Sequence, residues 1–520
     1  MASRTVNSTR NMIAGVVNKL ITIIFPFIIR TVINNNLGAE YLGLSSLFKS
    51  ILTMLSLAEL GISSAIVFSM YKPIANGDKQ EINALYRFYK IIYRVIGTVI
   101  MGVGLLLVPF LPKLMNGTAP ADINIYYIYL IYLLNTAISY FLSAYKESIL
   151  VAHQRTDISL NIISVCYLAM YVLQIIAVAV FKNYYVYSAL ILVITVIINV
   201  IRSSVVKYYY PDIKCEGELS DKSKAELKKK ILGLVVYKIS EVCRNSFDSI
   251  ILSTFLGLIV LAKYQNYYYI MTAVVSVFTL ISNAIIASIG NSIATETREK
   301  NQRDFNGILL LYGWLASWCT CCLASLYQPF MKIWMGESNM FEYEIVILFC
   351  IYFFTLSIAN ICFTYRQAAG LWWEDRYRPV IEALTNLLLN IALVQVMGAA
   401  GILVSTIITI AVLNIPLSIR VLYKNYFQES TKLYWINLIK ITFVGILACV
   451  ICVMCCSIIK LGGLVGLLIK GIICLILPNI ILCIGYLHIR DFTRSREIVF
   501  NMLPGRVKSI ITKRKNDECY

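Results

Sequence analysis

Residues 11–38 read NMIAGVVNKLITIIFPFIIRTVINNNLG, a run long and apolar enough to cross a bilayer as one helix. The run nevertheless contains Lys19, Pro26 and Arg30. At about 100° per residue these three side chains return to nearly the same face of the helix. The stretch therefore predicts a spanning helix with one polar stripe on an otherwise apolar surface.

The same stretch occurs a second time, 219 residues further along the chain. Residues 230–257 read KILGLVVYKISEVCRNSFDSIILSTFLG, so that Lys19 matches Lys238 and Gly38 matches Gly257. The ungapped register continues beyond these stretches, with roughly fifteen identities over about 65 positions. We infer an internal duplication and expect two related halves in the fold.

The composition is that of a polytopic membrane protein. Of the 520 residues, 59% are hydrophobic and 14% are charged, and the mean hydropathy is +0.74. A single soluble core cannot bury that much apolar surface. The formal net charge of +18 comes from basic residues between the apolar segments, a pattern that sets orientation in a bilayer and does not indicate nucleic acid.

Hydropathy predicts an all-α protein with about fourteen transmembrane segments of about 20 residues each. Their centres lie near residues 22, 56, 100, 133, 170, 195, 242, 278, 318, 355, 387, 409, 448 and 477. Lysines and arginines concentrate in the connections that follow even-numbered segments. By the positive-inside rule, both termini are predicted to be cytoplasmic.

The segments group into five predicted regions. These are an N-terminal six-helix bundle (1–205), a basic cytoplasmic linker (206–230), a second six-helix bundle (231–420), two additional transmembrane helices (437–488) and a basic cytoplasmic tail (489–520). Within the linker, the sequence LSDKSKAELKKK from Leu219 has two interpretations. It forms either a surface helix beside anionic headgroups or a solvated connection.

The sequence contains no signature of an enzyme, a cofactor or a metal site. It has no phosphate-binding Gly-x-x-x-x-Gly-Lys loop and no nucleophile elbow. Its fifteen cysteines lie mostly inside apolar segments, and its only histidines are His153 and His488. We therefore interpret the cysteines as small apolar residues and expect no bound metal, no cofactor and no catalysis.

The basic residues of the first and seventh segments are the candidates for substrate binding: Lys19, Arg30, Lys238 and Arg244. A charge at the centre of a spanning helix costs about 2.5–3.5 kcal/mol on insertion scales, so it must face water or a partner. Lysine and arginine donate charge-assisted hydrogen bonds, which suit a phosphate or pyrophosphate ligand. Arg30 ranks below Lys19, because a side chain near the outer interface can snorkel.

The seventh segment carries charges of both signs. Glu241 lies three residues from Lys238 and from Arg244, and Asp248 lies four residues after Arg244. Side chains at these spacings meet on a helix. Two interpretations follow, a self-neutralising ladder or the lining of a polar cavity, with Glu241 and Asp248 available for ion coupling or charge pairing.

Glu59 is a third acidic candidate, within the second segment. A carboxylate at that depth either binds a proton or cation for coupling, or pairs with a lysine such as Lys19 or Lys49. The residues alone favour neither interpretation.

Residues 37–85 read LGAEYLGLSSLFKSILTMLSLAELGISSAIVFSMYKPIANGDKQEINAL. The stretch has a Leu-Gly-x-x-x-x-Gly pattern before the second segment, an acid followed by Leu-Gly, and a Tyr-x-Pro that opens a basic connection. It resembles the Wzx-type polysaccharide and O-antigen flippases. These form the polysaccharide-transport branch of the superfamily that also holds multidrug exporters and flippases for lipid-linked peptidoglycan precursors.

The resemblance implies a V-shaped transporter of two six-helix repeats around a central cationic cavity, with two extra C-terminal helices. It implies translocation of an undecaprenyl-pyrophosphate-linked oligosaccharide across the bacterial cytoplasmic membrane by alternating access, for capsule, O-antigen or exopolysaccharide synthesis. Lys19, Lys238 and Arg244 match the basic cavity positions of the family. The expected partners are the polyprenyl-pyrophosphate-linked glycan, the lipid bilayer and other polysaccharide-assembly membrane proteins.

Three other functions compete with this interpretation. A cation-coupled exporter of drugs or small metabolites would use the same fold, and an acid-dominated cavity would favour it. A membrane polysaccharide polymerase or ligase would be expected to carry a large external loop, whereas the outer connections here are short. A structural subunit of an envelope assembly complex is the third alternative.

Overall fold

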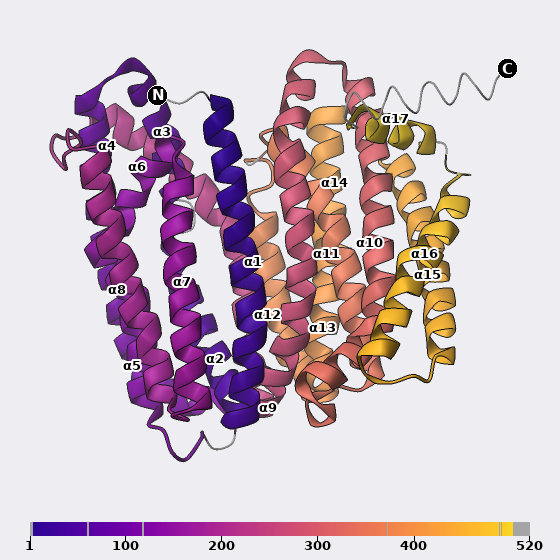
Figure 1. Cartoon of the computed structure of the whole chain (residues 1–520). Helices are drawn as coiled ribbons and strands as arrows, with labels where there is room; N and C mark the ends of the chain where they lie inside the picture. Colours follow the sequence, from indigo (N-terminus) through magenta and orange to yellow (C-terminus); the bar gives the residue numbers. More distant parts are fainter. Residues whose placement is uncertain are drawn as a thin grey trace. The chain divides into compact units, whose positions relative to one another are not determined.

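The computed structural model describes residues 4–59, 62–116, 119–371, 373–487, 489 and 491–502, and in these parts every regular element is a helix (Figure 1). The chain forms two compact units. Unit 1 consists of Met1–Asn266 and Pro379–Ile402, and unit 2 consists of Tyr267–Arg378 and Leu403–Tyr520. The five regions predicted from the sequence follow chain order, and their bounds stay a prediction.

Unit 1 is a bundle in which α1 packs along α7, α7 along α8, and α5 against both α4 and α8. Its elements are α1 (Arg4–Asn36), α2 (Ala39–Leu55), a 3₁₀ turn (Ser56–Glu59), α3 (Ile62–Asn76), α4 (Lys79–Leu107), α5 (Ile125–Leu142), α6 (Glu147–Ala152), α7 (Thr156–Ala179), α8 (Tyr184–Tyr209), the first part of α9 (Asp221–Thr295) and nearly all of α12 (Arg378–Met397).

Unit 2 is built around α10, which packs against α11, α15, α16 and α17. Its elements are the rest of α9, α10 (Arg298–Met335), α11 (Tyr343–Ala368), most of α13 (Ala399–Ile408), α14 (Ile415–Leu422), α15 (Lys432–Ile458), α16 (Gly463–Tyr486) and α17 (Phe492–Met502).

Twelve helices in the described parts of the chain are long and apolar enough to cross a membrane. The predicted count of fourteen is not confirmed. The predicted segments near residues 242 and 278 lie on either side of a kink at Gly257 within α9, whose candidate span Val242–Thr295 of 54 residues counts once. The predicted segment near residue 56 is interrupted by the 3₁₀ turn between α2 and α3. These two differences account for the lower number.

The backbone supports the internal duplication. Gly38 has φ 115° and ψ 168°, and its match Gly257 has φ 85° and ψ 175°. Both are conformations that glycine adopts at low cost and L-residues avoid. The offset of 219 also relates the end of α3 at Asn76 to the end of α9 at Thr295. Each copy therefore breaks its helix at the same glycine and ends it at the same turn.

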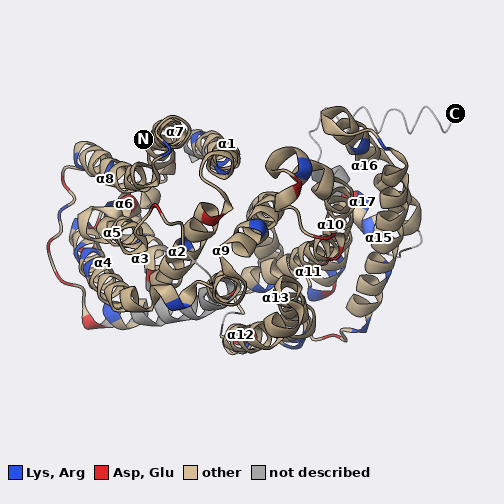
Figure 2. Cartoon of the chain, turned by 90° about the horizontal axis from the view of Figure 1, so that it is seen from below, with Lys and Arg blue, Asp and Glu red and all other residues tan. Residues whose placement is uncertain are grey.

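Both units expose many large apolar side chains. Figure 2 shows long tan stretches of helix with charged residues scattered among them. In α15 and α16, for example, Phe443 is 69% exposed and Leu468 is 67% exposed. A surface of this kind fits the hydrocarbon core of a bilayer, and the protein is a multi-pass membrane protein.

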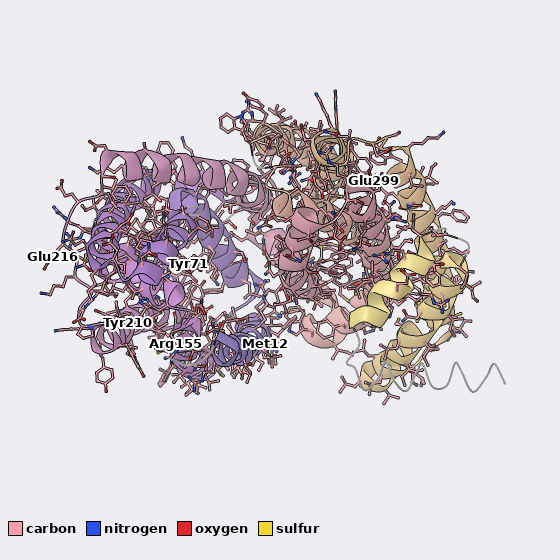
Figure 3. All side chains as sticks on the ribbon, turned by 90° about the horizontal axis from the view of Figure 1, so that it is seen from above. Met12, Tyr71, Arg155, Tyr210, Glu216 and Glu299 are labelled. Atoms are coloured by element: carbon pink, nitrogen blue, oxygen red, sulfur yellow. The ribbon has the colours of Figure 1, made fainter. Side chains whose placement is uncertain are left out.

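The connection between α8 and α9 folds onto α4. Lys79 pairs with Asp212 at 2.8 Å, and an Nη of Arg87 donates to the carbonyl oxygen of Gly217 at 2.9 Å. The Lys79 ammonium lowers the pKa of the Asp212 carboxyl through its hydrogen bond. Figure 3 shows Arg155, Tyr210 and Glu216 at this end of unit 1.

The lysine-rich sequence from Leu219 becomes helical at Asp221, where it begins α9. It is thus continuous with a candidate spanning helix and is not a separate surface helix. Contact of this segment with anionic headgroups stays a prediction.

Candidate functional site

Helix α1 presents three distinct faces. One face packs on α7, where Asn18 donates to Ser164 at 3.1 Å and the rings of Phe25 and Tyr171 stack with centroids 5.5 Å apart. A second face is apolar and exposed, and its side chains are Ile13, Val17, Leu20, Ile24 and Ile28. At about 100° per residue, the polar stripe predicted from the sequence occupies the third face.

Lys19 and Arg30 both lie on this stripe but in different surroundings. Lys19 is exposed and makes no ion pair with any residue that the structure describes. Arg30 is half-buried, and its Nε donates to the side-chain oxygen of buried Asn266 at 2.8 Å. The Arg30 guanidinium is thus held by Asn266 within unit 1, and its snorkelling toward the outer interface stays a prediction. Eleven residues along a helix correspond to about 16 Å, so these two cations do not form one clamp.

A further cation of unit 1 is Lys49 of α2, which lies within electrostatic reach of Arg30. Lys49 is exposed. No described acid forms an ion pair with Lys49. From the sequence, Lys49 was expected only as a partner for Glu59, because its distance from Arg30 depends on how α1 and α2 pack.

Lys238 and Glu241 lie on α9, and their side chains are outside the described part of the structure. That Lys238 occupies the place in the second copy that Lys19 occupies in the first therefore stays a prediction. The ladder of charges through Glu241 stays a prediction as well. Arg244 and Asp248, one turn further along α9, are described and buried, with exposed fractions of 7% and 2%.

Arg244 and Asp248 belong to a buried cluster between α9 and α12 within unit 1. Arg244 pairs with Glu382 at 2.9 Å, and Asn390 donates to Asp248 at 2.7 Å. Glu382 and Asn390 are 1% and 0% exposed. We call Arg244, Asp248, Glu382, Asn386 and Asn390 the α9–α12 cluster. The acid that neutralises Arg244 lies on another helix, 138 residues further along the chain. The spacing of charges along α9 does not predict this partner.

The α12 members of this cluster were missed from the sequence. A signal was present, since Glu382, Asn386 and Asn390 recur every four residues in an apolar helix. Polar residues at that spacing share one face and indicate a polar partner helix. Choosing α9 as the partner, however, requires the tertiary structure.

Glu59 ends the 3₁₀ turn between α2 and α3, and two tyrosines surround its carboxylate. Tyr93 of α4 donates to Oε1 at 2.5 Å, and Tyr140 of α5 donates to Oε2. The alternative in which Glu59 pairs with Lys19 or Lys49 is wrong, because no described lysine forms an ion pair with it. The carboxylate is held by neutral donors.

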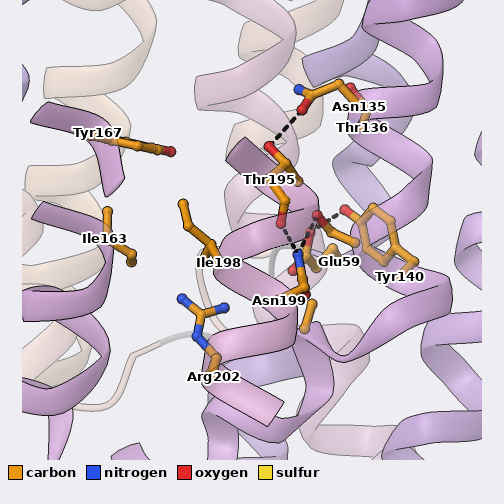
Figure 4. A pocket seen from close by; sticks show the side chains of 12 residues that line it. Glu59, Asn135, Thr136, Tyr140, Ile163, Tyr167, Thr195, Ile198, Asn199 and Arg202 are labelled. Carbon is orange, nitrogen blue, oxygen red and sulfur yellow. Dashed lines mark hydrogen bonds between the residues drawn. The ribbon is translucent and has the colours of Figure 1, made fainter. Parts of the chain in front are cut away.

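Glu59 also lines a polar cavity of about 320 Å³ inside unit 1 (Figure 4). The other walls come from α5, α7 and α8. Thr195 donates to Asn135 at 2.6 Å, and Arg202, at the edge of the cavity, pairs with Glu147 at 3.2 Å. A carboxylate beside a cavity of hydroxyls and amides can exchange a proton with water in that cavity.

The duplication shows that this carboxylate is specific to the first half. The residue 219 positions after Glu59 is Phe278, which is 1% exposed and packs edge-on against Tyr312 and Phe353. Tyr312 is the match of Tyr93. The second copy thus keeps the tyrosine and replaces the acid by an apolar ring, and its α9 remains helical there. Packing alone does not require an acid at this position.

Two helical units, a bilayer-compatible surface and charged or polar groups inside the helix bundle define a membrane transporter. The chain belongs to the polysaccharide biosynthesis protein family, whose model matches residues 8–287. The flippase resemblance of residues 37–85 is thereby confirmed. No curated protein matches the chain closely enough to count as a relative.

The fold is similar to that of solved flippases and exporters. The lipid II flippase MurJ, in an inward closed conformation, is 15% identical with a TM-score of 0.68, covering 92% of this chain and 98% of MurJ. An inward-facing MATE multidrug transporter is 12% identical with a TM-score of 0.62, covering 79% and 98%. A MATE transporter from Vibrio cholerae is 14% identical with a TM-score of 0.55, covering 82% and 100%.

Proposed function

We propose that this protein is a flippase that moves undecaprenyl-pyrophosphate-linked oligosaccharide repeat units across the cytoplasmic membrane by alternating access. The cargo would serve capsule, O-antigen or exopolysaccharide synthesis. The family match and the fold shared with a lipid-linked precursor flippase support this proposal. Both termini are cytoplasmic in the proposal, and other polysaccharide-assembly membrane proteins supply the cargo and consume it.

The observation that carries the proposal is the family match over residues 8–287. Within unit 1, Arg30 of α1 and Lys49 of α2 are cations whose charge-assisted hydrogen bonds suit a pyrophosphate, which carries its negative charges on adjacent phosphates. Lys19 and Lys238 complete the proposed binding set, whereas the ion pair of Arg244 with Glu382 favours a structural role for Arg244.

Proteoliposomes loaded with a labelled undecaprenyl-pyrophosphate glycan test this function. We expect wild-type protein to move the glycan between leaflets, and Arg30→Gln or Lys49→Gln to lower the rate at least about tenfold, because each removes one charge-assisted contact. Lys19→Ala and Lys238→Ala are expected to act in the same direction.

The matched control is Lys207→Gln, which removes an exposed lysine of α8 from the same unit. It should leave transport unchanged. Wild-type vesicles that leave the glycan in place would refute the flippase assignment, and equal rates in all variants would refute the binding set alone.

We further propose that Glu59 binds the coupling proton. Its tyrosine donors, its polar cavity and its replacement by Phe278 in the second copy support this role. Glu59→Gln keeps the shape and a carbonyl acceptor but cannot lose or gain a proton. We expect the variant to fold as the wild type does and to lose the acceleration of flipping by an imposed pH gradient. A variant that still responds to the gradient would exclude Glu59 as the coupling group.

A cation-coupled exporter is the second candidate function, since the fold is also that of MATE transporters. The acids Glu59 and Asp248 are the residues that would serve it. In the same vesicles, exchange of protons for a small organic cation without glycan movement would select this function. The polymerase or ligase alternative has no support in the family or in the similar folds, which are those of transporters.

A further inference from the structure

Three cysteines of unit 2 come together in the interior of the C-terminal helix pair. Cys452 and Cys456 lie one turn apart on α15, and Cys474 lies on α16. Their sulfurs lie within 4.8 Å of one another, and the residues are 0%, 3% and 1% exposed. Sequence reasoning based on the two histidines did not detect this cluster, because it depends on the pairing of α15 with α16.

The sulfur positions fit a metal ion. The distances from Cys474 Sγ are 3.7 Å to Cys452 Sγ and 3.9 Å to Cys456 Sγ. Metal–thiolate bonds of about 2.3 Å place sulfurs about 3.8–4.0 Å apart in tetrahedral or trigonal geometry. A small contraction of the cluster would therefore complete a three-thiolate site without repacking the helices.

Helix α10 supports the cluster from the other side. Trp318 Nε1 donates to the carbonyl oxygen of Cys474 at 2.8 Å, which fixes the turn that carries this thiol. The hydroxyl of Ser325 lies 3.6 Å from Cys452 Sγ and is placed to act as a fourth, neutral ligand. Oriented ligands of this kind are typical of metal sites.

We propose that Cys452, Cys456 and Cys474 bind one thiophilic divalent cation of the zinc group, which fastens α15 and α16 to each other beside α10. Thiolates select soft cations such as Zn²⁺ and Cu⁺. The net charge of a site with three thiolates is −1 with a divalent ion and −2 with Cu⁺. The smaller buried charge favours the divalent ion. Binding releases three protons, one from each thiol, to the solvent. Cys456 lies two residues before the end of α15.

Cadmium titration of the full-length protein in detergent tests the site. The protein is first treated with a chelator and kept reduced with a non-thiol reductant. We expect one Cd²⁺ per chain, an ultraviolet thiolate-to-metal absorption band and release of three protons. Cys452→Ser and Cys474→Ala should weaken binding at least about tenfold. The matched controls Cys455→Ser, on the same helix, and Cys483→Ser, on exposed α16 surface, should bind as the wild type does.

Thermal unfolding provides a second measurement that does not depend on absorption. Zn²⁺ should raise the melting temperature of wild type and of both controls, since a ligand stabilises the state that binds it. It should not raise that of the cluster variants, whose metal-free melting temperatures show that they fold. Absence of a band, a band that survives both cluster substitutions, or preference for Cu⁺ over Zn²⁺ would overturn the proposal. None of these outcomes bears on flipping.

Discussion

At the scale of single residues, the structure separates charges that are neutralised from charges that are not. Arg244 is buried against Glu382, and Glu59 receives two tyrosine hydroxyls. Lys19 and Lys49 have no acidic partner among the described residues. An exposed cation on a helix that spans hydrocarbon carries a cost that an anionic ligand can offset. Substrate recognition is therefore expected at Lys19 and Lys49.

The first residue-scale prediction concerns the ion pair between Arg244 and Glu382. Removing one partner leaves an uncompensated buried charge, so Arg244→Met or Glu382→Leu alone should destabilise the protein by about 3–5 kcal/mol. The double variant should recover most of that loss, because a buried pair replaced by apolar side chains is often neutral. The apparent melting temperature in detergent measures both effects.

Transport by the double variant then separates structure from binding. A folded double variant that flips glycan at the wild-type rate assigns Arg244 to structure. A folded double variant without transport would contradict that assignment and return Arg244 to the proposed binding set.

At the scale of elements, the helix breaks are more informative than the helices. Apolar runs in the sequence locate nearly every spanning helix, because burial in a bilayer requires about 20 apolar residues and little else. The 3₁₀ turn at Ser56–Glu59 was not predicted, since no Pro or Gly lies within it. It forms in the first copy, at the carboxylate, whereas the second copy carries Phe278 there and remains helical.

The glycine at the end of each repeated stretch permits a matched test. Backbone strain at φ 85° should make Gly257→Ala lower the free energy of unfolding by about 1–3 kcal/mol. A steric contact should add to this loss, because the new Cβ would lie 2.7 Å from the carbonyl oxygen of Asn116. Gly38→Ala meets no atom within 4 Å and should show the strain alone. Gly15→Ala, inside α1, should be neutral or stabilising by about 0.5–1 kcal/mol.

Melting temperatures of the three variants give the ranking. Equal decreases in melting temperature for Gly38→Ala and Gly257→Ala would show that the contact with Asn116 contributes nothing. A loss at Gly15 as large as at Gly38 would contradict the role of backbone conformation.

At the scale of the whole molecule, the sequence predicts the architecture far better than the site. The duplication and the apolar segments are local or periodic signals, and both are visible in one chain. The pairs that build the site join residues far apart in sequence, such as Arg30 with Asn266, and Arg244 with Glu382. Their spacing carries no signal, because it depends on how helices pack. Residue types alone therefore identified the charged positions but not their partners.

The last prediction concerns the C-terminal helices α15 to α17. They cover one face of α10, where Trp314 donates to Asn479 at 2.7 Å, Trp318 donates to Cys474, and Ile441 packs against Gly313. A chain ending at Phe427 would leave both indole N–H groups facing hydrocarbon, and each unsatisfied group there costs several kcal/mol. We expect the truncated protein to aggregate on size-exclusion chromatography in detergent.

The matched control ends at Met502 and keeps every described contact of α10, so it should elute as a single species and transport at the wild-type rate. The MATE transporter folds, which align with 79% and 82% of this chain, are complete without so long a chain. A monodisperse, active protein ending at Phe427 would therefore mean that the chain up to that residue folds without α15 to α17. Aggregation of that variant alone would instead show that the tryptophans of α10 have made the C-terminal helices part of the folding unit, because their indole groups have no other partner in the described fold.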